Sequence, residues 1–250
     1  MTLRDFFQRY RKAALAFSGG VDSAYLLWAA LREGADVRAY YVSTPFQPEF
    51  ERKDALRLAG ELGAPLTVLE VDILADRRVT QNPPNRCYYC KRALFGAILD
   101  AARADGYRMV LDGTNASDSS ADRPGMRALA ELSVRSPLRE CGLGKKEIRA
   151  LSRSVGLFTW EKPAYACLAT RIPAGTPITR EALVRTERAE AYLTSLGFRD
   201  FRVRCCGGAA RLQVTEDQLE LVAAHREELL DTLGAEYDGV LLDLAPRGKG

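Results

Sequence analysis

One stretch near the amino terminus carries the strongest structural signal in this 250-residue chain: Lys12-Ala13-Ala14-Leu15-Ala16-Phe17-Ser18-Gly19-Gly20-Val21-Asp22-Ser23. Residues 13–17 form a short apolar run of the kind found in strands that are buried on both faces. Residues 24–30 are good helix formers that follow the polar turn. The stretch therefore predicts a strand, a tight loop and a helix.

The loop has the composition of a phosphate-binding site. Gly19 and Gly20 allow positive φ and let backbone N–H groups come close to a ligand. The first turn of the helix adds unpaired N–H donors and the positive end of its dipole. Ser18 and Ser23 add hydroxyl donors, whereas Asp22 would repel a bare phosphate. A Mg²⁺ ion bridging the Asp22 carboxylate and the phosphate oxygens explains this acidic residue.

The loop is not a Walker A loop, because it is shorter and lacks the Gly-Lys-Ser/Thr ending. Ser-Gly-Gly-Val-Asp-Ser resembles the PP-loop of ATP pyrophosphatases, which cleave ATP to AMP and pyrophosphate and leave AMP on an oxygen of the substrate. The alternative is a glycine turn whose serines only cap a helix. The resemblance implies ATP and Mg²⁺ as cofactors, with these candidate nucleotide-binding residues: Ala16, Ser18, Gly19, Gly20, Asp22 and Ser23.

Composition sets broad limits on the protein. With 47% hydrophobic and 28% charged residues, the chain can bury one large core or two smaller ones. The net charge of +3 and the lack of a long basic run give no sign of a polyanion partner. Because we find no signal-peptide segment and no apolar run of membrane-spanning length, we expect a cytoplasmic protein. In that compartment the six cysteines are expected to be thiols or metal ligands.

Strands and helices alternate along the first part of the chain, after a lead-in helix at 1–11. This order predicts βαβ units and a parallel sheet. The expected elements after the first helix are a strand at 37–42, a helix at 50–62, a strand at 66–71, a helix from 87 to about 104, a strand at 109–112 and a helix at 145–155.

Gly113, Thr114 and Asn115 follow the expected strand at 109–112. Ligands bind outside the carboxyl ends of parallel strands, so we expect this segment near the phosphate loop and count Gly113 and Thr114 as nucleotide-binding candidates. A capped turn is the alternative, since these residue types are common in turns. Residues 122–125 are either a mobile loop over the site or plain surface.

The chain is expected to be an α/β protein with a second, small α+β domain. We place a PP-loop ATP pyrophosphatase domain, of the adenine nucleotide alpha hydrolase-like fold, at 1–158. A proline-containing linker that carries Cys167 follows at 159–178, and the small domain at 179–250. Its expected elements are a helix at 180–196, strands at 201–204 and 211–214, a helix at 216–233 and a strand at 240–244. The tail at 247–250 is expected to be disordered.

Three cysteines form a candidate metal site. Cys87 and Cys90 are close enough in sequence to chelate one metal, and Cys167 lies in the irregular linker. Three thiolates leave one position open, which suits a zinc ion with water or an iron–sulfur cluster with one unprotected iron. A redox-active Cys-x-x-Cys pair is the other possibility.

The remaining cysteines and the single histidine are given structural roles. Cys205 and Cys206 are adjacent in an expected strand, so their side chains point to opposite faces and do not serve one site. Cys141 stands alone in a loop. His225 lies in an amphipathic helix, which argues against a mechanism that needs a histidine base.

Five segments together resemble the LarE family along nearly the whole chain. They are residues 18–23, 86–91 (Arg-Cys-Tyr-Tyr-Cys-Lys), 112–115 (Asp-Gly-Thr-Asn), 136–138 (Ser-Pro-Leu) and 162–173 (Lys-Pro-Ala-Tyr-Ala-Cys-Leu-Ala-Thr-Arg-Ile-Pro). Proteins of that family are ATP-dependent sulfur transferases that make the thiocarboxylate groups of the nickel-pincer nucleotide cofactor of lactate racemase. The resemblance implies that a carboxylate of a pyridinium-3,5-dicarboxylate mononucleotide is adenylated, and that sulfur then displaces AMP.

The family resemblance also assigns roles to residues. Some members sacrifice the sulfur of one linker cysteine, whereas others carry three cysteines thought to hold a [4Fe-4S] cluster; Cys87, Cys90 and Cys167 match the second type. It implies Asp22 and Cys167 as catalytic residues, with sulfide or another sulfur donor as a partner. Thr170 stands where a serine is expected. The candidates for holding the substrate's phosphate or carboxylates are Arg171, Arg202 and Arg204, with plain surface arginines as the alternative.

Two other functions remain open at the level of sequence. A tRNA thiolase joins a PP-loop to a cysteine-held cluster in some families, but the small net charge does not indicate a tRNA surface, and we expect no nucleic-acid partner. A nucleotide-binding protein in which zinc braces a loop is the non-enzymatic alternative. The family resemblance further implies a homo-oligomer.

Overall fold

The computed structural model describes residues 1–118 and 124–248, which divide into two compact units. Unit 1 consists of Met1–Ile73 and Asn85–Lys162, and unit 2 of Leu74–Pro84 together with the chain from Pro163 onward. Residues 122 and 123 of the expected mobile loop, and residues 249 and 250 of the tail, lie outside the described residues.

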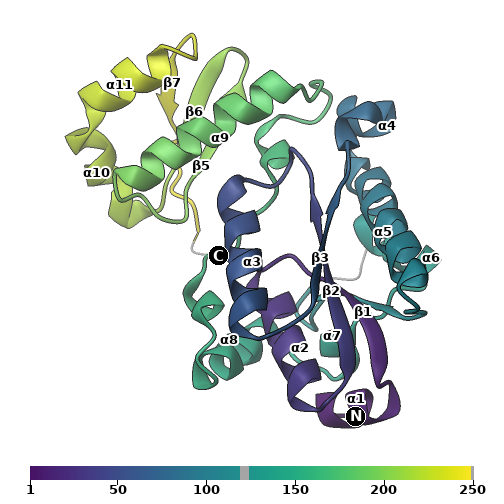
Figure 1. The fold of residues 1–250 in the computed structure, drawn as a ribbon. Coiled ribbons are helices and arrows are strands. Elements are labelled where there is room, and N and C mark those ends of the chain that lie inside the picture. The colour runs from purple at the N-terminus through teal and green to yellow at the C-terminus, as the bar shows by residue number, and fades with distance from the viewer. Residues whose placement is uncertain (119–123, 249–250) are drawn as a thin grey trace. The chain divides into compact units, whose positions relative to one another are not determined.

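Unit 1 is built on a parallel four-stranded sheet in the order β3-β2-β1-β4 (Figure 1). This confirms the predicted α/β fold. Its strands are β1 (Lys12–Ala16), β2 (Asp36–Ser43), β3 (Leu66–Glu70) and β4 (Val110–Leu111). Its helices are α1 (Leu3–Arg9), α2 (Val21–Arg32), α3 (Glu49–Glu61), α5 (Arg86–Ala104), α6 (Pro124–Glu131), α7 (Pro137–Glu140), α8 (Lys145–Ser154) and the 3₁₀ helix η2 (Phe158–Glu161).

Strand β1 is buried on both faces, as its apolar run predicts. Ala13 and Leu15 pack in one core with residues of α2, α3 and α8, while Ala14 packs in a second core with Ile98 and Ala102 of α5. Figure 1 shows these helices on opposite sides of the sheet. Successive side chains of β1 point to opposite faces of the sheet, so each face packs against its own layer of helices. The loops that follow β1 and β4 begin at the carboxyl ends of these strands.

Unit 2 contains a three-stranded sheet in the order β5-β6-β7, antiparallel between β5 and β6 and parallel between β6 and β7. The strands are β5 (Arg202–Cys206), β6 (Ala209–Gln213) and β7 (Val240–Leu242). Its helices are α4 (Arg77–Thr80), η3 (Leu168–Arg171), α9 (Arg180–Ser195), η4 (Glu216–Gln218), α10 (Leu219–Ala224) and α11 (Arg226–Gly234), and the 3₁₀ helix η1 (Ile73–Ala75) begins at the unit boundary. The predicted continuous helix at 216–233 is wrong, because His225 adopts φ −100° and ψ 19° and separates α10 from α11.

Asn82 fastens the first segment of unit 2 to the later part of the chain. This residue has φ of 52°, and its Nδ2 donates to the carbonyl oxygens of Ile172 (3.3 Å), Pro173 (2.8 Å) and Thr176 (3.1 Å). A short asparagine side chain tolerates the left-handed conformation. One buried amide therefore organises much of the proline-containing segment after η3.

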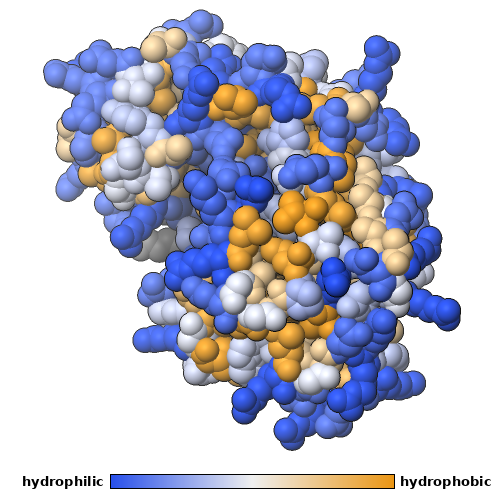
Figure 2. Space-filling model, viewed as in Figure 1, coloured by the Kyte–Doolittle hydropathy of each residue, from blue (hydrophilic) through white to orange (hydrophobic). Residues whose placement is uncertain are grey.

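Hydrophilic side chains predominate on the face shown in Figure 2, with hydrophobic residues exposed in separate groups. Exposed apolar side chains on α3 include Phe50 and Leu56, at 45% and 41% exposure. Across the part of the chain that the structure describes, none of the helices has the length and apolar character needed to cross a membrane.

Candidate active site

The predicted phosphate loop joins β1 to α2, as expected. Gly19 has φ of 72°, whereas Gly20 has φ of −77° and caps α2, so only the first glycine uses the left-handed region. The hydroxyls of Ser18 and Ser23 lie 3.1 Å apart, and Gly20 N–H donates to Ser18 Oγ at 3.3 Å. Ser23 Oγ also donates to Gly20 O at 3.2 Å. The two serines thus brace the loop from within.

Asp22, in the first turn of α2, is the charged centre of this loop. Its Oδ2 lies 2.5 Å from Nζ of Lys145, the first residue of α8, and its Oδ1 accepts from Asn115 Nδ2 at 3.4 Å. The side chains of Asp22 and Lys145 keep 21% and 35% exposure. Both side chains are therefore accessible enough to bind a ligand in place of each other. The hydrogen bond from Asn115 orients the Asp22 carboxylate.

The segment after β4 lies against the phosphate loop, which confirms the expected position of residues 113–115. A Cβ added to Gly113 would lie 2.9 Å from Ser23 N, so only glycine allows the two backbones to approach this closely. Asp112 is buried and accepts from Thr114 N at 3.3 Å and from Ser136 Oγ at 2.6 Å. Thr114 Oγ1 donates to the same carboxylate. These bonds fix the turn that follows the strand.

Cys87 and Cys90 lie in the first turns of α5 in unit 1, one exposed and the other half-buried. Buried Arg86 donates from Nη2 to Cys87 Sγ at 3.9 Å. Lys91 follows them, and burial lowers the pKa of its ammonium against the opposing effect of Asp112. The Asp112 carboxylate, which directly follows β4, thus acts electrostatically on the Lys91 ammonium of α5.

Cys167 belongs to unit 2, where it immediately precedes η3. No group of three or more His, Cys, Asp or Glu side chains suited to holding a metal ion occurs within residues 1–118 and 124–248. No disulfide joins any of the six cysteines, all of which lie within the described residues. Cys205 is buried and Cys206 exposed on β5, which confirms their opposite orientation.

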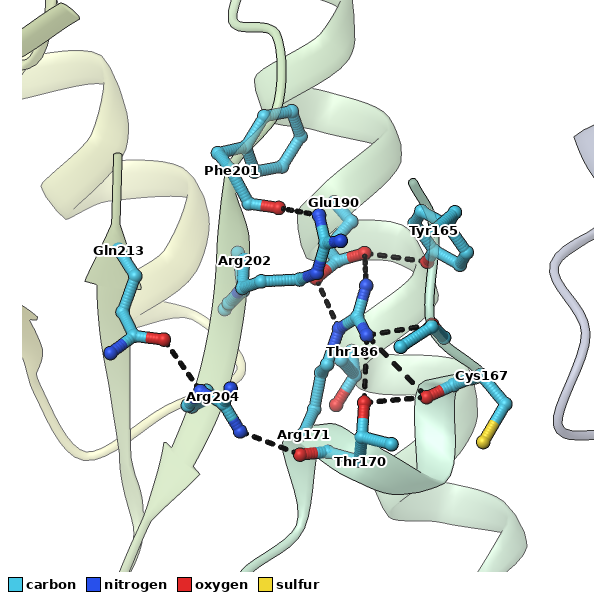
Figure 3. A network of polar contacts seen from close by, with 12 residues as sticks. Tyr165, Cys167, Thr170, Arg171, Thr186, Glu190, Phe201, Arg202, Arg204 and Gln213 are labelled. Carbon is cyan, nitrogen blue, oxygen red and sulfur yellow. Dashed lines mark hydrogen bonds and ion pairs between the residues drawn. The ribbon is translucent and has the colours of Figure 1, made fainter. Parts of the chain in front are cut away.

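The three arginines proposed from sequence lie together in unit 2 (Figure 3). Arg171 forms a buried ion pair with Glu190 of α9. Arg202 donates to the carbonyl oxygens of Phe201 and Ala164, each at 2.5 Å. Arg204 donates to Gln213 Oε1 at 2.5 Å and to Thr170 O at 2.7 Å.

This group of arginines carries an excess of positive charge. The pKa of Arg202 falls to about 10, because its guanidinium is buried and because Arg171 and Arg247 repel it. Burial also lowers the pKa of Arg204, with Arg171 adding to the effect. Of the three, Arg204 is half-buried, while Arg171 and Arg202 are only 1% and 5% exposed. Arg204 is therefore the most accessible to an anion.

Sequence reasoning missed Lys145 and Glu190. Lys145 had a usable signal, because a lysine in the first turn of a helix opposes the helix dipole and needs another reason to be there. Glu190 had none, since a glutamate in an amphipathic helix is ordinarily solvated. The substrate-binding roles of the arginines and the metal-binding roles of the cysteines stay predictions.

Comparison with known proteins identifies relatives along most of the chain. No family model matches. The chain is 35% identical over 239 residues to the pyridinium-3,5-bisthiocarboxylic acid mononucleotide synthase of Lactiplantibacillus plantarum, which covers 94% of this chain and 86% of that protein. It is 40% identical over 221 residues to an uncharacterised protein of Synechocystis sp., which covers 87% of this chain and 82% of that protein.

A more distant similarity covers less of the chain. A tRNA-specific 2-thiouridylase of Thermotoga petrophila is 28% identical over 142 residues, or 47% of this chain and 40% of that protein. The names of the Lactiplantibacillus plantarum and Thermotoga petrophila proteins describe enzymes: the first is a synthase of a thiocarboxylic acid and the second is a thiouridylase. The extent and identity of the first match show that this chain belongs to the family of the pyridinium-3,5-bisthiocarboxylic acid mononucleotide synthase, the LarE family of PP-loop proteins.

Proposed function

We propose that this protein is an ATP-dependent sulfur transferase that converts a carboxylate of a pyridinium-3,5-dicarboxylate mononucleotide into a thiocarboxylate, in the biosynthesis of the nickel-pincer nucleotide cofactor. The observation that carries the proposal is the 35% identity over 94% of the chain to a synthase whose name states such a product. The strand, loop and helix around Asp22 support the use of ATP.

The residues of unit 1 fit Mg²⁺-ATP in their chemistry. The approach of Gly113 to Ser23 keeps the loop compact, and the first turn of α2 supplies N–H donors to phosphate oxygens. Asp22 offers the carboxylate that Mg²⁺ prefers, and Lys145 offers a positive charge for the departing pyrophosphate. Bound Mg²⁺-ATP supplies the adenylyl group that turns a poor electrophile into an activated one.

The reaction balances in two displacements. A carboxylate oxygen of the substrate attacks the α-phosphorus, and the bond to the β-phosphate oxygen breaks to release pyrophosphate. A sulfur nucleophile then attacks the carboxyl carbon, and the carbon–oxygen bond breaks to release AMP with that oxygen. The nucleophile in this second step is sulfide, so the product is the thiocarboxylate, and we assign Cys167 as a ligand of the group that would present this sulfide. We assign Arg202 and Arg204 to the phosphate or second carboxylate of the substrate.

The decisive assay of this function measures pyrophosphate and AMP from radiolabelled ATP, with the dicarboxylate mononucleotide as substrate. We expect both products in equal amounts and a mass gain of about 16 Da on the substrate, the difference between sulfur and oxygen. Nicotinic acid mononucleotide, which lacks the second carboxylate, is the control substrate. Release of neither product with the dicarboxylate would contradict the proposal.

A tRNA thiolase is the second candidate, and the match to a tRNA-specific 2-thiouridylase favours it. Unfractionated tRNA added to the same assay separates the two. Pyrophosphate release that depends on tRNA, with a salt-dependent shift of tRNA in a gel, would support the thiolase. Tight ATP binding without turnover of any substrate would instead support a nucleotide-binding protein.

We further propose that Cys87, Cys90 and Cys167 hold a [4Fe-4S] cluster, whose thiolate ligands are the donors that these residues supply. On anaerobic purification we expect a brown protein with about four irons and four sulfides per chain. Cys90→Ala should lose both, whereas Cys141→Ala should keep them as the matched control. A colourless protein after reconstitution would leave Cys167 as a sacrificial donor, and stoichiometric zinc would indicate a structural site.

A further inference from the structure

The backbone at Cys167 is held by a local set of hydrogen bonds. Its carbonyl oxygen accepts from Thr170 N at 2.9 Å and from Thr170 Oγ1 at 2.8 Å, and Arg171 Nη1 lies 3.4 Å away. The same Nη1 donates to Ala166 O at 2.7 Å and to Thr170 Oγ1 at 2.9 Å. Two consecutive carbonyl groups beside the thiol therefore point at one guanidinium.

That guanidinium is fixed from its other side by Glu190. Arg171 Nε donates to Oε1 at 2.8 Å and Nη2 donates to Oε2 at 3.0 Å, which makes a bidentate pair. The side chains of Arg171 and Glu190 are 0% and 7% exposed. Such a buried fork has one orientation, because turning the guanidinium would break several bonds at once.

Glu190 also connects the pair to the rest of unit 2. Its Oε2 accepts from Tyr165 Oη at 2.6 Å, and its Oε1 accepts from Val203 N at 2.9 Å on β5. Figure 3 shows the Glu190 carboxylate of α9 bonded to both Tyr165 and Arg171, and its bond to Val203 N adds β5 to the group. The segment from 165 to 171 is therefore bonded to α9 of unit 2 at both ends.

We propose that Arg171 is a positioning residue for the Cys167 thiol, held in place by Glu190 and acting on the backbone of residues 166 and 167. This inference rests on the proposed function for the use to which the thiol is put. Every nitrogen of the guanidinium has a protein acceptor, and the group is shielded from solvent. Arg171 thus sets the direction of Cys167, and the more exposed Arg204 meets the anionic substrate.

Thr170 offers the mildest way to loosen this loop. Thr170→Val keeps the shape of the side chain but removes one donor to Cys167 O and one acceptor of Arg171 Nη1. In the metal-free protein, we expect the alkylation rate of the half-buried Cys167 by iodoacetamide, resolved by peptide mass spectrometry, to rise about fivefold relative to that of Cys206. Cys206 is exposed on β5 of the same unit and serves as the internal reference.

Two further variants separate positioning from general destabilisation. Thr170→Ser restores the hydroxyl and should restore the wild-type ratio. Leu229→Ala shortens a buried side chain of α11 in the core of unit 2, so it should lower the thermal midpoint without changing the ratio. Equal acceleration of Cys167 and Cys206, or an unchanged ratio in Thr170→Val, would overturn the proposal.

Glu190→Gln is the second, stronger perturbation, and Thr170→Val decides the matter if that variant does not fold. The alkylation needs neither ATP nor substrate, so its outcome is independent of the pyrophosphate assay. A raised ratio without pyrophosphate release would support the positioning role and contradict the proposed reaction. Pyrophosphate release with an unchanged ratio would do the reverse.

Discussion

With asparagine in place of Asp22, we expect the rate of pyrophosphate release to fall by about 100- to 1,000-fold. Asp22 is the acidic residue in the first turn of α2 and the partner of Lys145 at 2.5 Å. Asparagine keeps the size and the hydrogen bond from Asn115, but it removes the negative charge that attracts Mg²⁺. The expected fall in rate therefore reflects weaker Mg²⁺ binding at the phosphate loop, and the structure of the loop should not change.

Calorimetry on the same protein separates the roles of the two charges. Asp22→Asn should bind ATP with nearly equal affinity in Mg²⁺ and in EDTA, because its metal ligand is gone. Lys145→Met should weaken ATP binding about tenfold in both conditions, since it loses a charged contact to phosphate. Lys146→Met, which removes an exposed charge from the same turn of α8, is the matched control. Unchanged turnover in Asp22→Asn would contradict the assignment of the phosphate loop.

The fold of unit 1 was predictable because its signals are local. An apolar run of five residues, two glycines and a helix-forming run are adjacent in sequence, and they specify strand, loop and helix without reference to distant residues. The approach of residues 113–115 to the phosphate loop followed from the rule for carboxyl ends of parallel strands. Topology thus brought together segments that lie far apart in sequence.

The polar partners within each unit were not predictable, because long-range packing creates them. Lys145 lies 123 residues from Asp22, and no periodicity connects the two. Arginine is usually exposed, so Arg171 was interpreted from sequence as a residue that meets the substrate. Its burial depends on a carboxylate 19 residues away on α9, which only the packed unit reveals.

The same holds for the composition of unit 2. Residues 74–84 precede α5 of unit 1 in sequence, yet they pack with the chain after Pro163. The bonds from Asn82 to residues 172–176 stabilise this arrangement, but an asparagine before two prolines only indicates a turn. Local patterns therefore identify elements, and buried hydrogen bonds decide which elements join one unit.

The Arg171–Glu190 pair should dominate the stability of unit 2. Arg171→Met leaves the Glu190 carboxylate buried without its charged partner, and we expect a loss of about 3–5 kcal/mol in the free energy of unfolding of this unit. Glu190→Met should cost a similar amount by leaving Arg171 unpaired. The double variant should be more stable than either single one, because two apolar side chains of similar volume replace the pair.

Urea denaturation followed by two signals tests this expectation. Both tryptophans of the chain, Trp28 and Trp160, lie in unit 1, so indole fluorescence follows that unit and provides the internal control. Far-UV circular dichroism also reports the helices of unit 2. In the single variants, its unfolding transition should occur at a lower urea concentration than in the wild type, or its helical signal should already be reduced without urea. Arg171→Lys keeps the charge but not the bidentate fork, so its midpoint should fall in between. Single variants that lose less than about 1 kcal/mol would place the pair among ordinary surface ion pairs, in contradiction to its burial.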